Sequence, residues 1–130
     1  MKKLFSIVML ALFSVCALGS AKDTTYKARI TYFSNGKLVA CQKAKRGIVG
    51  VSVAAHPDFK FGTRISIPAL AGISGNGNYI VHDRGPDVTA KRASRGKAYV
   101  FDIYVGSQAN VRRLAYSKKV PMYMDVIVHK

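Results

Sequence analysis

The stretch Arg64-Ile65-Ser66-Ile67 alternates polar and apolar side chains, and Pro68 follows it at once. Alternation with a period of two is typical of a β-strand with one buried face, and proline cannot continue the ladder. Short segments of this kind, rich in β-branched or aromatic residues, recur along the chain at 26–33, 48–54, 63–67, 79–81, 99–104 and 122–128. Gly, Pro, Asn or Ser bound each of them. The pattern predicts an all-β barrel or sandwich.

Two connecting segments carry signals of their own. Residues 71–78 (AGISGNGN) are rich in Gly and Asn and predict a hairpin turn between two strands. Residues 107–116 are the one helical candidate, in which Ser107 can cap the amino end while Val111 and Leu114 lie on one face. No internal repeat or second domain is visible, and a chain of 130 residues suits a single domain.

The first 21 residues have the character of a secretory signal peptide. Two lysines precede an apolar run over 4–18, and Gly19-Ser20-Ala21 offers small residues for cleavage after Ala21. The run is too short for a comfortable membrane span. We therefore expect the domain to comprise residues 22–130 and to be secreted to the periplasm or cell envelope.

The cysteines give the domain no cross-link. Cys16 lies in the expected signal peptide, and the residues before it, Phe13-Ser14-Val15, fit a lipid-attachment box poorly. Cys41 is then the one cysteine of the domain, so no intramolecular disulfide forms and the fold depends on its core. Because no histidine stands near it in the sequence, we interpret Cys41 as a small apolar residue.

The chain is strongly basic. It has 21 Lys and Arg against 6 acidic residues, a net charge of +15, and removal of Lys2 and Lys3 with the signal peptide leaves +13. A small secreted domain of this charge favours anionic partners, and cell-wall polymers, phospholipid headgroups and nucleic acid are the candidates. No aromatic RNA-binding motif is present, so nucleic acid is not expected. A basic surface with no specific partner is the other interpretation.

All six acidic residues are aspartates, so a carboxylate mechanism must draw on this short set. Asp83 follows the strand-like run at 79–82 and begins Asp83-Arg84-Gly85-Pro86. It can hydrogen-bond its own turn, or act as a general acid or base. Asp102 lies in the apolar run 99–105, where it needs a partner such as Arg84 or a backbone N–H. It either ties down a loop or has a raised pKa suited to general-acid work.

The histidines leave further options. His56 precedes Pro57 and His82 stands beside Asp83, and each can be a surface histidine or a site residue. Together with Cys41 they lack the spacing of a zinc site, so no metal is expected. The chain has no Gly-rich phosphate loop and no serine nucleophile elbow, and no cofactor is expected.

Three segments in order resemble a known family. They are Ala54-Ala55-His56 with Phe61-Gly62-Thr63-Arg64, then Asp83-Arg84-Gly85-Pro86, then Phe101-Asp102-Ile103. Together they resemble the double-psi β-barrel domain of the rare lipoprotein A family, and they are similar to the three-aspartate domain of membrane-bound lytic transglycosylase A. Expansins and barwin-like proteins share that barrel. The resemblance covers residues 28–128 and implies a six-stranded double-psi β-barrel with one or two short helices.

The resemblance also implies action on the glycan strands of peptidoglycan. The family's aspartate corresponds to Asp83, which would be the acid/base of a lytic transglycosylase or glycosidase. Asp102 would tune the pKa of that group or steady an oxocarbenium-like charge, and His56 would position substrate or assist proton transfer. The candidate substrate-binding residues are Arg84, Tyr32 and His82, with the arginine orienting a carboxylate.

A binding module is the competing class. Expansin-type barrels loosen wall polymers without measurable hydrolysis, and a barrel of charge +13 with several tyrosines would suit a non-catalytic peptidoglycan- or polysaccharide-binding protein. Such a binder would release no product, and its affinity for the wall would fall steeply with salt. In either case we expect a monomer whose partners are peptidoglycan glycan strands and anionic wall polymers.

Overall fold

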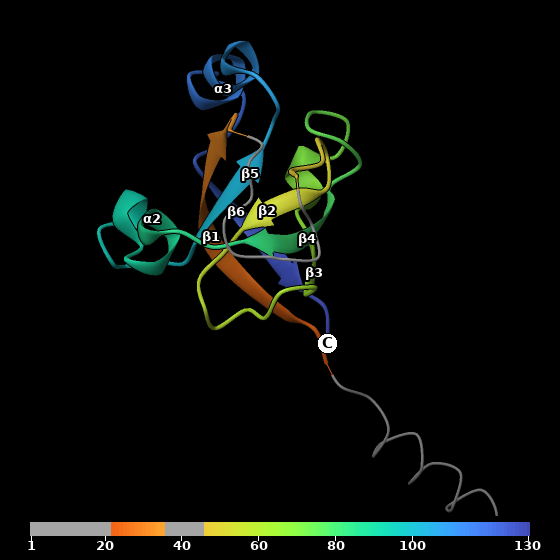
Figure 1. Ribbon diagram of the computed structural model, residues 1–130, viewed down its shortest axis with the longest axis vertical. Coiled ribbons are helices and arrows are strands. Elements are labelled where there is room, and N and C mark those ends of the chain that lie inside the picture. Colours follow the sequence, from red (N-terminus) through yellow and green to blue (C-terminus); the bar gives the residue numbers. More distant parts are fainter. Residues whose placement is uncertain (1–21, 36–45) are drawn as a thin grey trace, which may run out of the picture.

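The computed structural model of the chain describes residues 22–35 and 46–130. The predicted signal peptide, with Cys16, lies outside the described residues, and so does Cys41. The described part confirms the all-β prediction, because its strands form one closed barrel with short helices around it (Figure 1). The strands are β1 Thr24–Phe33, β2 Ser52–Ala54, β3 Arg64–Ser66, β4 Asn78–Asp83, β5 Val100–Tyr104 and β6 Tyr123–Val128.

The barrel mixes parallel and antiparallel pairs. Its strands follow the order β1-β5-β2-β4-β3-β6 before closing on β1. The β1·β5 and β2·β4 pairs are parallel, whereas the other pairs are antiparallel. Parallel neighbours cannot be joined by a tight hairpin, so longer connections must cross between them. Segments that are distant in the sequence therefore meet on the barrel wall.

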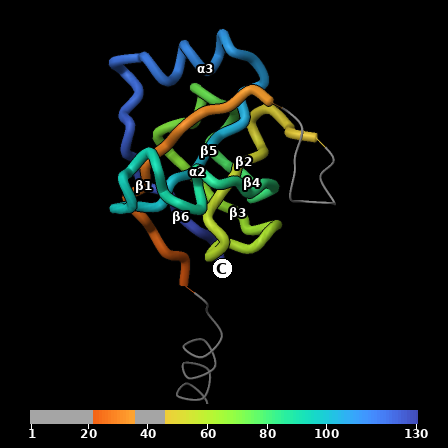
Figure 2. Tube along the Cα trace, turned by 60° about the vertical axis from the view of Figure 1, so that its left-hand side comes forward, coloured from red at the N-terminus to blue at the C-terminus, as the bar shows by residue number. Residues whose placement is uncertain are grey.

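Helical elements occupy the connections. The longest is α3 Gln108–Ala115, and the others are α2 Pro86–Thr89, η1 Pro68–Leu70 and η2 Arg92–Ser94. The Ser107 hydroxyl accepts a hydrogen bond of 3.2 Å from the Asn110 N–H, which confirms the predicted cap of α3. Figures 1 and 2 both show α3 at one end of the barrel, while α2 lies against its side.

The barrel interior is filled by apolar side chains from every strand. Alternation along each strand sends one set of residues inward, as the sequence pattern predicts. Fully buried members of this core are Ile30, Val53, Ile65, Val81, Phe101, Ile103 and Val126. A second, smaller cluster lies outside the barrel, where Val88 of α2 packs on Ala54 and Val100. This outer cluster seats α2 beside the strand ends that carry the candidate site.

A close backbone contact joins two turns at the edge of the barrel. Gly75 has φ +70°, and a Cβ built on it would lie 2.9 Å from the Cα of Gly50. We expect Gly75→Ala to lower the free energy of unfolding by about 2 kcal/mol, since it adds a steric clash to a left-handed backbone. Urea denaturation measures the change.

Gly62→Ala is the matched control for this prediction. Gly62 has φ +87°, but a Cβ there meets no atom within 4 Å. It therefore carries the conformational strain without the clash. Equal losses of stability in the two variants would show that the contact with Gly50 has no energetic weight.

Candidate active site on the outer wall of the barrel

Two aspartates flank a single alanine on the barrel wall. Ala54 of β2 pairs with Asp83 of β4 on one side and with Asp102 of β5 on the other. Paired residues share a face of the sheet, so both carboxyl groups lie on the outward face with Ala54. One strand separates them, which places their Cα atoms about 10 Å apart.

A register shift in β4 brings Asp83 to this face. Val53 pairs with Val81 but the next residue, Ala54, pairs with Asp83, so His82 is an extra residue in the ladder. Without the shift, strict alternation would place Asp83 inward with Val81, because the two positions differ by two. A bulge that turns a side chain to the other face is a recurring feature beside active sites.

Asp102 has the environment of a general acid. Burial raises its pKa to about 6, the Thr31 hydrogen bond works against that increase, and the negative charges of Asp87 and Asp83 add to it. The Thr31 hydroxyl donates to the Asp102 carboxylate over 2.9 Å. Among the described residues, the hydrogen-bond partner of Asp102 is this hydroxyl, where the sequence suggested Arg84 or a backbone N–H. The expectation of a raised pKa agrees with its environment.

Asp83 is more deeply buried, with 8% of its surface exposed. Its carboxylate accepts a hydrogen bond of 2.8 Å from the Arg84 N–H, so it holds its own turn as one of the two interpretations predicts. That role and a role in chemistry are compatible, since a carboxylate has lone pairs for several donors.

Arg84 holds the segment that carries His56. Its Nη1 lies 2.8, 2.7 and 2.9 Å from the carbonyl oxygens of Ala55, His56 and Phe59. Its guanidinium also stacks 4.3 Å from the ring centre of Phe61. Burial lowers its pKa, and the neighbouring Asp83 opposes that change. The hydrogen bonds of the Arg84 side chain are therefore to backbone carbonyls, so it acts on the site through the loop it fixes.

His56 comes two positions after Ala54 and contacts Tyr99. Its Nδ1 accepts a hydrogen bond of 3.0 Å from the Asp58 N–H, which leaves the ring proton on Nε2. The rings of Tyr99 and His56 meet edge-on with their centres 5.4 Å apart. The Tyr99 hydroxyl donates a hydrogen bond to the Asp58 carboxylate. That hydrogen bond is the main reason that the pKa of Tyr99 rises to about 12. Lys91 Nζ lies 4.5 Å from the centre of the Tyr99 ring.

His82 is fixed by a buried serine. The Ser52 Oγ, fully buried, lies 2.8 Å from His82 Nδ1 and accepts the Ile48 N–H over 2.9 Å. The serine hydroxyl can therefore donate its own hydrogen to Nδ1 of His82. The imidazole then carries its proton on Nε2, on the side of the ring away from the serine. Burial lowers the pKa of His82, which favours this neutral form.

Tyr32 is not brought to this face. It pairs with Ile103 of the core and alternates with Thr31, so its side chain points to the opposite side of β1. Its hydroxyl is buried with no hydrogen-bond partner among the described residues. Burial is the main cause that raises the pKa of Tyr32 to about 12. The structure thus groups Asp83, Asp102, His82 and the His56 loop, and leaves Tyr32 apart.

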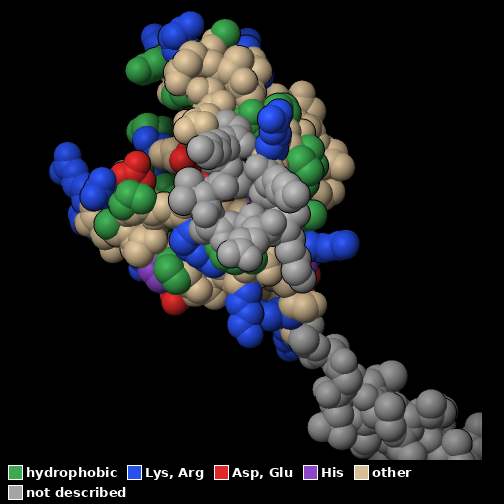
Figure 3. All heavy atoms as spheres, in the orientation of Figure 1, with side chains coloured by type: hydrophobic (Ala, Val, Ile, Leu, Met, Phe, Trp, Pro, Cys, Tyr) green, Lys and Arg blue, Asp and Glu red, His purple; other side chains and the backbone are tan. Residues whose placement is uncertain are grey.

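In the basic segment 91–97, η2 packs against β1 and against β5, the strand that carries Asp102. The backbone of the segment takes left-handed conformations at Lys91 (φ 53°) and Arg95 (φ 55°), on either side of η2. Arg92 Nη1 pairs with Asp87 of α2 at 2.9 Å. Figure 3 shows Lys and Arg side chains around the α2 side of the molecule and over α3, with acidic side chains beside the first group.

Three residues of the site were not found from the sequence: Thr31, Ser52 and Asp87. The first two act through partners 71 and 30 positions away, so only strand pairing reveals them. Asp87 had a local signal, because it is one of six acidic residues and stands four positions after Asp83. Placed in the first turn of α2, its charge reaches Asp102.

Metal and membrane features are absent from the described residues. Over 22–35 and 46–130, no group of three His, Cys, Asp or Glu side chains could hold a metal ion. No helix in those ranges is both long enough and apolar enough to cross a bilayer.

A scan against protein-family models gives no match, and searches of curated proteins and of solved structures give none. The described residues form a closed six-stranded barrel that carries two carboxyl groups on one outward face.

Proposed function

We propose that this protein cleaves the glycan strands of peptidoglycan, as a lytic transglycosylase or a glycosidase. The observation that carries the proposal is the pair Asp83 and Asp102, set on either side of Ala54 on one outward face. Glycosidic bond cleavage uses such carboxyl pairs, one of which is held protonated by its surroundings. A double-psi type of barrel, with its parallel β1·β5 and β2·β4 pairs, is part of the same proposal.

The environments of the two carboxyl groups favour different catalytic roles for Asp102 and Asp83. A group whose pKa is about 6 holds its proton in mildly acidic solution, which suits Asp102 as the donor to the leaving oxygen. Asp83 would then stabilise the oxocarbenium-like charge. This exchanges the roles inferred from the motif, where Asp83 was the acid/base. In a lytic reaction the deprotonated Asp102 would accept the proton of the muramyl 6-hydroxyl as the 1,6-anhydro ring closes.

The surrounding residues would orient the strand. His82 offers its Nε2–H beside Asp83, and His56 offers the same group from the loop that Arg84 holds. The basic segment 91–97 would attract anionic wall polymers toward the site. Secretion to the periplasm or cell envelope, and action as a monomer, belong to the same proposal.

A second candidate is a non-catalytic, expansin-like wall-binding module. The observation that favours it is the net charge, +15 for the chain and +13 without Lys2 and Lys3, together with exposed basic side chains around α2 and α3. Such a protein would pellet with the wall at low salt and release from it at high salt, because exposed charges are screened within about 8–10 Å.

Mass spectrometry of products released from purified peptidoglycan tests the proposal. We expect soluble fragments that end in 1,6-anhydro-muramic acid, or reducing ends if the reaction is hydrolytic. Asp83→Asn should reduce product formation by on the order of 10²-fold or more while the fold stays intact. Full activity in this variant would remove Asp83 from the mechanism. Salt-sensitive pelleting with no product from the wild type would favour the binding module.

A further inference from the structure

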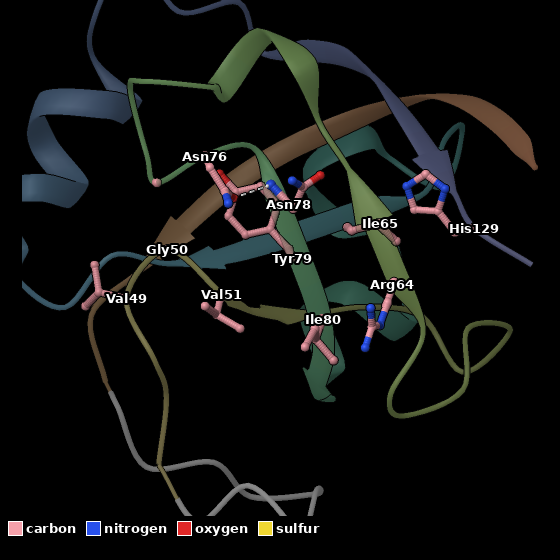
Figure 4. Close-up of a pocket in the computed structure, with 11 residues that line it drawn as sticks. Val49, Gly50, Val51, Arg64, Ile65, Asn76, Asn78, Tyr79, Ile80 and His129 are labelled. Atoms are coloured by element: carbon pink, nitrogen blue, oxygen red, sulfur yellow. Dashed lines mark hydrogen bonds between the residues drawn. The ribbon is translucent and has the colours of Figure 1, made fainter.

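The outer wall of the barrel has a large groove that the carboxyl pair does not occupy. It has a volume of about 760 Å³ and runs over β3 and β4 toward the turns at Gly50 and Gly75. Figure 4 shows Arg64, Ile80 and Val51 side by side across it, with Asn76 and Asn78 at one end. Grooves of this volume accommodate ligands of the size of a small oligosaccharide.

The polar side chains that line the groove present donors. Asn76 accepts the Asn78 N–H with its Oδ1, and Asn78 accepts the Ser66 hydroxyl with its Oδ1. Each amide therefore has its NH₂ group available. Both ring nitrogens of His129 are engaged, one with Asp23 and one with Ser66.

Arg64 adds a charged donor to this set. Within residues 22–35 and 46–130 its side chain makes no hydrogen bond or ion pair, and Arg64 is exposed on β3 opposite Ile80. Guanidinium groups bind carboxylate and other anionic oxygens with two parallel hydrogen bonds. Since none of the described residues that line the groove is a carboxylate, the charge of Arg64 complements a negative ligand.

Strand β4 runs from the groove, which it lines with Asn78 and Ile80, to Asp83 of the candidate site. Asn78, Ile80 and His82 follow one another at every second position, so they share the outward face of the strand. Asp83 comes next because of the register shift. A chain laid along β4 would meet an amide donor, an aliphatic surface, the His82 Nε2–H and then the carboxyl pair.

We propose that this groove is the subsite that binds the glycan strand beyond the cleaved bond, through sugar carbonyl and carboxylate oxygens. The direction in which the glycan strand runs along β4 rests on the proposed function. The chemistry of the groove does not. The acceptors it selects are those of N-acetylated, carboxylate-bearing sugars. The Ile80 and Val51 side chains contact the apolar faces of the sugar rings.

NMR titration of the protein with glycan strands freed of stem peptides tests the proposal. Asp102→Asn is the background for every sample, so that the strands are not cleaved. We expect shift changes at Arg64, Asn76, Asn78 and Ile80. Arg64→Gln and Asn78→Asp, the second of which turns an amide donor into an acceptor of equal size, should each raise the dissociation constant about tenfold. Arg113→Gln, on exposed α3, should change it less than twofold.

Two further probes identify the chemistry. A neutral N-acetylglucosamine oligomer should bind more weakly than the carboxylate-bearing strand, and with a smaller effect of Arg64→Gln. Inorganic phosphate should compete weakly. Tight phosphate binding at Arg64 without sugar binding would overturn the proposal, because it would identify a site for a phosphate polymer.

The outcomes separate this inference from the proposed function. Weaker strand binding in Arg64→Gln and Asn78→Asp, with no product released by the wild type, would support the groove and refute cleavage. Normal product release, with dissociation constants within twofold of the parent in both variants, would refute the groove alone. Shift changes confined to Asp83, position 102 and α2 would also overturn it.

Discussion

Asp102→Asn is expected to remove glycan cleavage almost completely, with a fall in rate on the order of 10³-fold. The substitution keeps the shape of the side chain and the hydrogen bond from Thr31, but it leaves no acidic proton for the leaving oxygen. Loss of a general acid typically lowers the rate by 10²–10⁴-fold. Product formation measured by mass spectrometry over time gives the effect.

The dependence on pH follows from the same group. Asp102 must be protonated to act as the acid, and burial raises its pKa to about 6. The rate of the wild type should therefore decline as the pH rises above about 6, approaching tenfold per pH unit. Activity that increases steadily from pH 5 to pH 8 would contradict the role of Asp102 as proton donor.

The stability of the fold should also depend on pH through Asp102. A carboxyl group with a raised pKa in the folded state keeps its proton there while the unfolded chain has lost it. Stability therefore falls as the pH rises from about 4 to about 6, and stays lowered above that range. Asp102→Asn removes this effect, so at pH 7 we expect it to raise the free energy of unfolding by about 2 kcal/mol.

Asp125→Asn is the matched control. Asp125 is exposed and pairs with Lys27 on the surface, so its loss should change stability by less than about 0.5 kcal/mol. A loss of stability in Asp102→Asn at pH 7 would show that Asp102 ties down the structure, the other interpretation of its place in the strand. A gain in stability with a loss of activity is the pattern of a functional carboxyl group.

Arg84→Ala is expected to lower the free energy of unfolding by about 3 kcal/mol. The change leaves the carbonyls of Ala55, His56 and Phe59 without their shared donor and removes the stacking on Phe61. Hydrogen bonds to a charged group contribute about 1.5–3 kcal/mol, and their loss leaves partly buried acceptors unpaired. Chemical denaturation at pH 7 measures the loss.

Two comparisons sharpen this result. Arg84→Lys keeps the charge but not the planar guanidinium, so it should recover only part of the stability. Arg92→Ala removes an arginine whose ion pair with Asp87 is solvent-exposed, and it should cost less than about 1 kcal/mol. If Arg84→Ala and Arg92→Ala were equally mild, the three carbonyl contacts would have no role in holding the His56 loop.

Much of the fold could be predicted from local pattern. The alternation of polar and apolar residues, with Gly and Pro between the alternating segments, locates six strands. Ser107 marks the start of α3. The helical character of 86–94 was not predicted, because α2 and η2 are too short for a periodic pattern and are held by the packing of Val88 on the barrel. Short elements of this kind depend on tertiary contacts rather than propensity.

The site was predictable only in part, because its geometry depends on pairing. The sequence singles out Asp83 and Asp102 as carboxylates at a strand end and within a strand. It does not contain the register shift at His82, which decides the face that Asp83 occupies. Tyr32 is the converse case, since an aromatic residue suited to sugar stacking lies on the inward side of β1. A shift of one residue reverses the facing of a side chain, and no local signal reports it.

The pairing of β1 constrains how the chain folds. Its two neighbours, β5 and β6, come from the last third of the sequence, and β6 also completes the edge of β3. Few contacts of the barrel can therefore form early, and the long loop closures make folding slow compared with that of a helical domain of equal size. A chain that stopped before β6 would expose two unpaired strand edges, which are templates for aggregation. Strand β6 thus closes the barrel by pairing with both β1 and β3, and we expect the barrel to fold in a single cooperative step that requires this strand.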